Sequence, residues 1–215
     1  MREIIFPDPS LADKDGLLAF GGDLEPDTLV SAYSSGIFPW SVKPVSWWSP
    51  DPRAIFEIET FRLSRRLARL YRNGNLVFTF DKSFKEVMQG CARPAPGREK
   101  TWISKEFIAA YCRLHKVGIA HSTEAWADGK LVGGVYGVAI GGFFAGESMF
   151  HTLSNASTLS LFHLIDHLKK QGYRLFDSQV ISSHTASLGA IEIPRKEYLH
   201  RLERALKIPC TFSGK

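Results

Sequence analysis

The sequence has few cysteines and few long apolar segments. Its three cysteines, Cys91, Cys112 and Cys210, are far apart, so they offer neither a disulfide framework nor a C-x-x-C zinc site, and a reducing, cytoplasmic compartment is expected. The acids and prolines in the N-terminal segment M-R-E-I-I-F-P-D-P-S do not indicate a signal peptide. The uncharged stretch at 131–146 is shorter than the about 20 apolar residues of a membrane span, so we expect no membrane partner.

Motifs of several enzyme classes are also missing. The sequence contains no P-loop and no G-x-G-x-x-G, which disfavours nucleotide hydrolysis and dinucleotide redox chemistry. No G-x-S-x-G elbow is present, so a serine hydrolase is disfavoured. His163 and His167 are four residues apart, but Leu164 stands where the H-E-x-x-H pattern needs a glutamate, so we expect no metal site and no cofactor.

Charge is distributed unevenly along the chain. Of the 215 residues, 44% are hydrophobic and 23% charged, which allows a buried core. Residues 1–60 are acidic, with four Lys or Arg against ten Asp or Glu, whereas residues 61–120 carry thirteen against four. This contrast predicts two units, 1–60 and 61–215, and a polyanionic partner such as nucleic acid. A solubilising surface charge without a partner is an equally good interpretation.

Residue patterning predicts a mixed α/β (α+β) fold with one central sheet. The turn signals Asp128-Gly129 and Gly141-Gly142 indicate an antiparallel meander. Asn155 is expected to cap the helix that follows it. Pro50 and Pro52 are expected to stop any strand, and we place the boundary between the units near residues 53–62. Helices are predicted over 26–35, 61–72, 83–90, 104–117, 155–171 and 196–206, and strands over 76–80, 119–126, 130–140, 142–149 and 173–180.

The predicted helix over 61–72 is the best candidate for binding a polyanion. Its arginines fall within an arc of about 120° at helical spacing. A guanidinium donates hydrogen bonds in pairs and therefore suits phosphate oxygens, and such contacts fix orientation without reading sequence. The residues concerned are Arg62, Arg65, Arg66, Arg69 and Arg72.

Tryptophans and polar strand ends are further candidates. Trp40 and Trp102 lie next to turns, where an indole can stack on an unpaired base. Trp47 and Trp48 are adjacent, so in a strand at least one of them should be core.

Two strands of the predicted sheet end in polar residues. Glu147 and Ser148 follow Gly146, whose missing side chain lets a ligand approach the backbone. Asp177 and Gln179 should face the same side of a strand. A buried polar pair satisfied by backbone is an equally good interpretation of these last two residues.

Taken together, the ordered blocks of the chain resemble one family. They are G-L-L-A-F-G-G-D at 16–23, G-I-F-P-W at 36–40, W-W-S-P-D-P-R at 47–53, T-W-I at 101–103, L-V-G-G-V-Y-G-V at 131–138, G-E-S-M-F at 146–150, D-S-Q-V at 177–180, H-T-A-S-L-G-A at 184–190 and E-I-P-R at 192–195. The sequence resembles the bacterial leucyl/phenylalanyl-tRNA–protein transferases over roughly residues 6–206. The loop at 91–100 is longer than is usual in that family.

The resemblance implies a fold, an activity and partners. The fold would be a small N-terminal domain and a larger domain like that of the N-acetyltransferases (GNAT). The activity would be transfer of Leu or Phe, and less readily Met, from aminoacyl-tRNA to the α-amine of proteins that begin with Arg or Lys. The products would be delivered by an adaptor to a Clp protease for N-end-rule degradation. No cofactor is implied.

The resemblance also implies roles for individual residues. Trp40 and Trp102 would hold the terminal adenosine of the tRNA. Glu147, with the backbone around Gly146 and Ser148, would contact the aminoacyl group or the incoming amine.

Asp177 and Gln179 would orient the attacking α-amine and help to deprotonate it. Because a neutral amide is not a base at ordinary pH, we assign Gln179 to orientation. The cluster that would bind the acceptor stem is Arg65, Arg69 and Arg72.

We hypothesise that an apolar pocket selects the aminoacyl side chain. Leu, Phe and Met are unbranched at Cβ, whereas Val and Ile are branched there. The residues expected to line the pocket are Val135, Phe144, Met149, Leu161 and Phe176.

Two other function classes stay open on the residues alone. An acyl-CoA-dependent N-acetyltransferase would share the expected fold, but residues 150–156 read F-H-T-L-S-N-A where such enzymes carry an R/Q-x-x-G-x-G/A phosphate loop. A non-catalytic RNA-binding module would explain the arginines and tryptophans. It would not explain why Glu147, Asp177 and Gln179 gather at strand ends.

Overall fold

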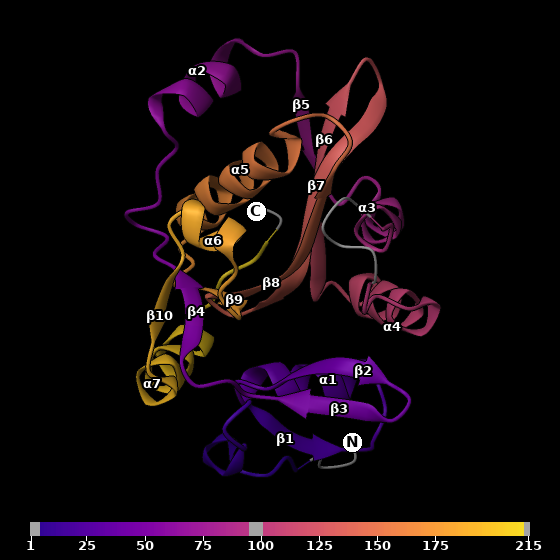
Figure 1. The fold of residues 1–215 in the computed structure, drawn as a ribbon, viewed down its shortest axis with the longest axis vertical. Helices are drawn as coiled ribbons and strands as arrows, with labels where there is room; N and C mark the ends of the chain where they lie inside the picture. Colours follow the sequence, from indigo (N-terminus) through magenta and orange to yellow (C-terminus); the bar gives the residue numbers. More distant parts are fainter. Residues whose placement is uncertain (1–4, 95–100, 213–215) are drawn as a thin grey trace.

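The computed structural model describes residues 5–94 and 101–212, and its strands form two sheets (Figure 1). The smaller sheet is antiparallel, with the order β1-β3-β2, and lies at one end of the molecule together with helix α1. A short 3-10 helix, Pro9–Leu11, precedes it. Its elements are β1 (Leu17–Phe20), α1 (Pro26–Ser34), β2 (Phe38–Val42) and β3 (Val45–Trp48).

The larger sheet has seven strands in the order β10-β4-β9-β8-β7-β6-β5. The only parallel pair among the described strands is β8 with β9, and the other neighbours are antiparallel. The predicted central sheet and its antiparallel meander, β6 to β8, are therefore confirmed. The strands are β4 (Arg53–Phe56), β5 (Val77–Phe80), β6 (Ala120–Ala127), β7 (Lys130–Ile140), β8 (Phe143–His151), β9 (Leu175–Gln179) and β10 (Ile191–Ile193).

Helices cover both faces of this sheet. In Figure 1, α5 lies on one side of the long strands, whereas α3 and α4 lie on the other. No helix in the described ranges is long and apolar enough to cross a membrane. The helices are α2 (Arg65–Asn73), α3 (Phe84–Cys91), α4 (Lys105–Lys116), α5 (Ala156–Lys170), α6 (Ser183–Ser187) and α7 (Arg195–Leu206).

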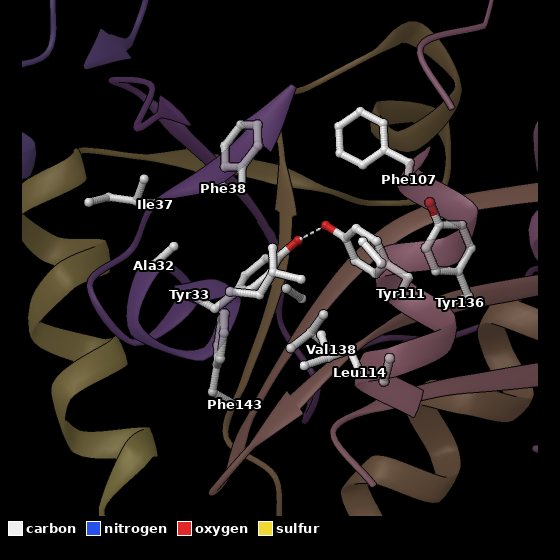
Figure 2. Packing of buried hydrophobic residues seen from close by; sticks show 14 of the residues in the cluster. Ala32, Tyr33, Ile37, Phe38, Phe107, Tyr111, Leu114, Tyr136, Val138 and Phe143 are labelled. Atoms are coloured by element: carbon white, nitrogen blue, oxygen red, sulfur yellow. Dashed lines mark hydrogen bonds between the residues drawn. The ribbon is translucent and has the colours of Figure 1, made fainter. Parts of the chain in front are cut away.

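One apolar core joins the small sheet to the larger one. Figure 2 shows Tyr33 of α1 and Tyr111 of α4 pointing toward each other among buried side chains that include Val138 and Phe143. Each of these four side chains is at most 1% exposed. The hydroxyl groups of the two tyrosines form a hydrogen bond. The N-terminal part of the chain is therefore packed firmly onto the larger sheet, which matters because the candidate site lies between them.

One predicted helix start is wrong, and Asn155 takes its predicted N-cap position without forming the expected side-chain hydrogen bond. The arginine-rich helix begins at Arg65 rather than at residue 61, because the Ser64 side chain accepts a hydrogen bond from the Leu67 backbone and caps it. Arg62 thus lies outside the helix and donates to the Phe61 carbonyl. Asn155 precedes α5 but has a φ of 67° and makes no side-chain cap bond.

The prolines at positions 50 and 52 do not keep a strand from forming. Strand β4 begins at Arg53, directly after Pro52, and pairs with β9 and β10 inside the larger sheet. We therefore propose a boundary between Trp48 and Arg53, slightly earlier than the one drawn from sequence. In the loop noted at 91–100, Cys91 still belongs to α3, and residues 95–100 lie outside the described residues.

Candidate active site

A cavity of about 550 Å³ opens where the two sheets meet. It is lined by Trp40 of β2, by Trp102 from the segment before α4, by the middle of β8, by the end of β9 and by α6. Glu147 and Ser148, which were expected at a strand end, thus lie within β8, which continues to His151. The full lining is Phe38, Pro39, Trp40, Phe56, Trp102, Val135, Gly146, Glu147, Ser148, Met149, Leu161, Phe176, Ser178, Gln179, Val180, Ser182, His184 and Thr185.

The parallel strands β8 and β9 supply the polar part of this cavity. Their pairing runs from Phe143–Leu175 to Ala145–Asp177, and the residues that follow on both strands line the cavity. A Cβ atom on Gly146 would lie 2.8 Å from Cε1 of Phe176. A glycine is needed here because the Phe176 ring packs directly against the β8 backbone.

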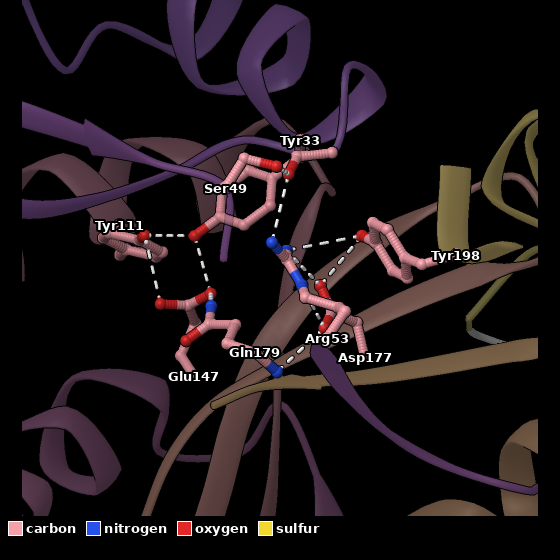
Figure 3. A network of polar contacts seen from close by, with 9 residues as sticks. Tyr33, Ser49, Arg53, Tyr111, Glu147, Asp177, Gln179 and Tyr198 are labelled. Carbon is pink, nitrogen blue, oxygen red and sulfur yellow. Dashed lines mark hydrogen bonds and ion pairs between the residues drawn. The ribbon is translucent and has the colours of Figure 1, made fainter. Parts of the chain in front are cut away.

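Glu147 is held at the cavity by three side chains (Figure 3). Its Oε1 accepts hydrogen bonds of 2.6 Å from the Tyr33 hydroxyl and 2.6 Å from Nε2 of Gln179, and its Oε2 accepts one of 3.3 Å from Tyr111. The residue is 9% exposed. Burial raises the pKa of Glu147 to about 7, the hydrogen bond from Tyr33 opposes this shift, and the negative charge of Asp177 adds to it.

Asp177 forms a separate buried network. Nε and Nη2 of Arg53 donate to its two carboxylate oxygens at 2.9 and 2.7 Å, and the Tyr198 hydroxyl donates at 2.9 Å. The Arg53 and Asp177 side chains are 1% and 0% exposed. Although burial disfavours the charged guanidinium, Asp177 raises the pKa of Arg53 above its ordinary value. Such a bidentate buried pair fixes both partners rigidly.

Gln179 connects the two networks. Its backbone N–H donates to Oδ1 of Asp177 at 2.8 Å, and its side-chain amide donates to Glu147. Its φ of 65° lies in the left-handed region, which a residue other than glycine occupies only when its surroundings hold it there. The bond to Asp177 thus helps to fix the conformation that points the amide at Glu147.

The two tryptophans favoured from sequence both reach the cavity. Trp40 is 38% exposed and packs edge-to-face on Trp48, with ring centroids 5.0 Å apart. Trp102 is partly buried and packs edge-to-face on Phe107. Trp47 is 2% exposed, which confirms that at least one of the adjacent tryptophans belongs to the core.

Most of the expected apolar pocket is present, with one correction. Val135, Met149, Leu161 and Phe176 line the cavity. Phe144 does not line it, because its ring packs within the core against Phe176, at a centroid distance of 5.4 Å. Phe56, which the sequence did not suggest, is part of the lining.

Two other predicted groups lie outside the cavity. Asp177 is absent from its lining because Arg53 and Tyr198 cover it. Arg65, Arg69 and Arg72 are exposed on α2, which Figure 1 places toward the end of the molecule opposite the small sheet. The structure therefore brings together ten of the proposed site residues and leaves Phe144, Asp177 and the three arginines apart from them.

Sequence reasoning missed four residues that organise the site. Tyr33, Tyr111 and Tyr198 lie on helices among apolar neighbours, so their sequence pattern is that of core residues. Arg53 carried a signal, because it directly precedes the apolar run A-I-F of a fully buried strand. A buried cation of this kind requires a buried partner.

No three His, Cys, Asp or Glu side chains are grouped to hold a metal ion within residues 5–94 and 101–212.

Among solved structures, the chain is similar to L-PGS from Bacillus licheniformis, with 18% identity over 75% of this chain and 54% of that chain and a TM-score of 0.45. A GCN5-related N-acetyltransferase-like protein from Streptococcus suis gives 12% identity, coverage of 78% and 63%, and a TM-score of 0.38. Similarities of this size carry no functional argument.

Sequence comparisons give a firmer result. Residues 22–51 match the model of the leucyl/phenylalanyl-tRNA protein transferase N-terminal domain, and residues 55–203 match that of leucyl/phenylalanyl-tRNA protein transferase itself. A transferase of that name from Anaeromyxobacter sp. is 50% identical over 100% of this chain and 92% of the relative. Another, from Syntrophotalea carbinolica, is 49% identical over 99% of this chain and 94% of the relative. The chain belongs to the leucyl/phenylalanyl-tRNA–protein transferase family.

Proposed function

We propose that the protein is an aminoacyltransferase that moves Leu or Phe, and less readily Met, from aminoacyl-tRNA to the α-amine of proteins that begin with Arg or Lys. One observation supports this most: a single cavity brings two tryptophans, an apolar surface and a carboxyl group with a pKa of about 7 together. These are the parts needed to hold an aminoacyl-adenosine and to receive an amine. Membership of the family supports the same activity.

The donor occupies the cavity in two parts. The terminal adenosine lies against Trp40 and Trp102, two residues from different units that both line the cavity. The aminoacyl side chain lies among Val135, Leu161 and Phe176, in a space suited to side chains without branching at Cβ. An apolar pocket distinguishes single methylene groups by only about 1–3 kcal/mol, so Leu, Phe and Met are all used.

The acceptor amine meets Glu147. Oε1 of Glu147 already accepts two short hydrogen bonds, whereas Oε2 accepts one of 3.3 Å, so Oε2 is the better placed oxygen for an incoming amine. The amine nitrogen attacks the ester carbonyl carbon, the bond from that carbon to the ribose oxygen breaks, and an amide forms. Glu147 takes the proton that the nitrogen loses and passes it to the ribose oxygen, so that this oxygen leaves as a hydroxyl group and Glu147 returns to its carboxylate form. A base with a pKa near the working pH suits this transfer.

Asp177 acts by holding neighbouring groups in place. All four of its hydrogen bonds described here come from Arg53, Tyr198 and the Gln179 backbone, so it holds Gln179 and does not reach the amine. An aminoacyl ester is already activated, so alignment of two bound reactants supplies much of the acceleration, about 7–11 kcal/mol in favourable cases.

The finer assignments rest on the family resemblance. They are selection of Arg and Lys at the acceptor N-terminus, N-end-rule degradation of the products through a Clp protease adaptor, and a cytoplasmic location. Arg65, Arg69 and Arg72 of α2, all exposed, bind the acceptor stem.

One competition assay tests the proposal. The protein is incubated with labelled Leu-tRNA, acetyl-CoA and a peptide that begins with Arg, and the peptide is then weighed. A gain of one leucyl residue supports the transferase. An acetyl gain indicates an acyl-CoA enzyme, and tight RNA binding without any gain indicates a non-catalytic module; either result contradicts the proposal.

A further inference from the structure

A second groove lies on the face of the sheet that carries α3 and α4. It encloses about 920 Å³ between these two helices and the turn that follows β5. Figure 1 shows α3 and α4 on the side of the long strands opposite α5. Its lining is Asp81, Lys82, Ser83, Phe84, Lys85, Glu86, Gln89, Lys105, Ile108, Ala109, Cys112, Arg113, His115 and Lys116.

Positive charge dominates this groove. Its five Lys and Arg side chains face only two acids, and one of these, Asp81, already accepts from His121 at 2.7 Å and from the Ser122 backbone at 2.9 Å. Arg113 forms an ion pair with Glu25. Among the described residues, Lys85, Lys105 and Lys116 form no ion pair and are exposed.

Two of these lysines line the groove together with Cys112, Lys85 from α3 and Lys116 from α4. Both of their charges act to lower the pKa of the Cys112 thiol, although burial of that thiol raises its pKa overall. The two helices thus each contribute a lysine to the wall of the groove that holds Cys112. An unpaired cluster of this kind attracts an anion with several charged oxygens.

The groove is continuous with the candidate active site along the chain. Trp102 lines the active-site cavity, and three residues later Lys105 begins α4 and lines the groove. The Ser104 side chain accepts from the Phe107 backbone and fixes this connection. A nucleic-acid strand whose last base lies at Trp102 therefore has Lys105 close to that base, and the groove continues from Lys105 along α4 to Lys116.

We propose that the α3–α4 groove binds the phosphodiester backbone of the donor tRNA near its aminoacylated 3′ end. This inference rests on the proposed function and adds a phosphate site separate from the arginines of α2. The basic middle section of the sequence is thereby divided between two surfaces, α2 and the groove; Figure 1 shows α2 in a different part of the molecule from α3 and α4, whose residues line the groove. RNA is favoured over an acidic protein because Lys105, which lines the groove, is only three residues from the tryptophan that would hold the tRNA's last base.

The test compares two triple variants of equal charge. In the groove variant, Lys85, Lys105 and Lys116 are each changed to Gln; in the control, the exposed Lys14, Lys130 and Lys196 are changed to Gln. KM is measured for Leu-tRNA and for 3′-leucyl-adenosine, which has no phosphate. In the groove variant we expect KM for Leu-tRNA to rise on the order of tenfold. The slope of the logarithm of the tRNA binding constant against the logarithm of the salt concentration should become shallower by about 2–3. KM for 3′-leucyl-adenosine should not change.

Cys112 provides a second measurement on the unchanged protein. Its thiol lies in the groove, so bound Leu-tRNA should slow its alkylation by iodoacetamide, measured by peptide mass, whereas 3′-leucyl-adenosine should not. This readout keeps the proposal testable if the groove variant fails to fold.

Two results overturn the groove proposal: an unchanged KM and salt slope for Leu-tRNA in the groove variant, or absence of protection at Cys112 in the unchanged protein. Failure of the unaltered protein to use either donor would instead contradict the proposed function.

Discussion

Glu147 and Asp177 are both buried carboxyl groups, and their surroundings give them different tasks. Glu147 meets only hydrogen-bond donors without charge, so burial dominates and its pKa rises to about 7. Asp177 faces a guanidinium in bidentate geometry, which ties both partners together. The first carboxyl is suited to exchanging a proton near neutral pH, whereas the second is suited to holding its neighbours in place.

The raised pKa of Glu147 predicts a pH dependence. We expect kcat/KM to rise with pH through an apparent pKa near 7, because the unprotonated form accepts the proton. In Glu147→Gln this ionisation should disappear and kcat should fall by about 10²–10⁴. The ionisation of the peptide amine, with a pKa of about 7.7–8.0, is common to both enzymes and serves as the control. An unchanged profile in the variant would exclude Glu147 as the base.

The same shift predicts how stability varies with pH. The folded carboxyl has a pKa of about 7 against an ordinary 4.5, so between these values the folded state binds more protons than the unfolded state. The free energy of unfolding should therefore be highest below pH 4.5, as far as this group is concerned, and fall as pH rises toward 7. Denaturant titrations at several pH values should show this fall in the free energy of unfolding for the wild type and not for Glu147→Gln. The same dependence on pH in both proteins would contradict the assignment.

The pair of Arg53 and Asp177 predicts a separation of stability from activity. Arg53→Met leaves a buried carboxylate unpaired and should lower the free energy of unfolding by about 3–5 kcal/mol. Adding Asp177→Leu removes the stranded charge and should recover much of that loss. The double variant should still have a reduced kcat, because the Gln179 backbone has lost its acceptor. Thermal unfolding and kcat are measured together, and full activity in the double variant would refute the positioning role.

At the scale of elements, the site depends on where strands stop pairing. Strands β8 and β9 pair as far as Ala145 and Asp177, and the next residues of each line the cavity. Small elements on the periphery complete it: α6 provides His184 and Thr185, and β2 provides Trp40. The long strands thus fix the floor, and the short elements supply the walls.

Gly146 predicts an effect on side-chain selection. In Gly146→Ala the new Cβ would meet the Phe176 ring at 2.8 Å, so the ring must move into the cavity at a cost of about 1–3 kcal/mol. We expect KM to rise more for Phe-tRNA than for Leu-tRNA. Adding Phe176→Leu should restore room, and it is the matched control. Equal effects on both donors would show that the ring does not border the side-chain pocket.

At the scale of the whole molecule, the site is built from two units that the sequence separates. Tyr33 and Trp40 come from the small N-terminal sheet and its helix, whereas Glu147 and Gln179 come from the larger sheet. The buried contact between Tyr33 and Tyr111 joins them. The proposed proton transfer at Glu147 therefore depends on contact between the two units.

This contact across the units predicts a shift in the pH profile. The hydrogen bond from Tyr33 lowers the pKa of Glu147, so Tyr33→Phe should move the apparent pKa of kcat/KM above 7. Tyr173→Phe changes another buried tyrosine, one that does not line the cavity, and should leave the profile in place. A profile that does not move in Tyr33→Phe would separate Tyr33 from the proton transfer.

Local patterns predicted the regular elements better than they predicted the contacts. Strands β6 to β8 follow from their turn signals, and β7 was placed at its observed bounds, 130–140. The β4 strand was missed because nothing nearby shows that its partners are β9 and β10, more than a hundred residues later. The Arg53–Asp177 pair joins positions 124 apart, and no local pattern reports such a contact.

The site was predicted where a residue's chemistry contradicts its setting. Trp40 was identified because it lies next to a turn, and Gln179 because a polar residue near the end of a strand is unusual; Glu147 was identified on the same ground, although β8 continues past it to His151. Tyr33 and Tyr111 were missed because a buried tyrosine is ordinary, and only the fold shows that both hydroxyls reach the same carboxyl. Phe144 was wrongly expected to line the cavity. Alternate residues of a strand face opposite sides, and the neighbouring strand decides which of them reaches the cavity.

The most direct test of the central claim is the rate at which the purified protein forms a peptide bond between Leu-tRNA and a peptide beginning with Arg. Coenzyme A and nucleoside triphosphates are left out, and buffer alone is the reference. We predict rapid leucylation of the α-amine, with the leucine placed before Arg in the fragment spectrum. A rate no greater than that in buffer, or a requirement for coenzyme A, would contradict the account.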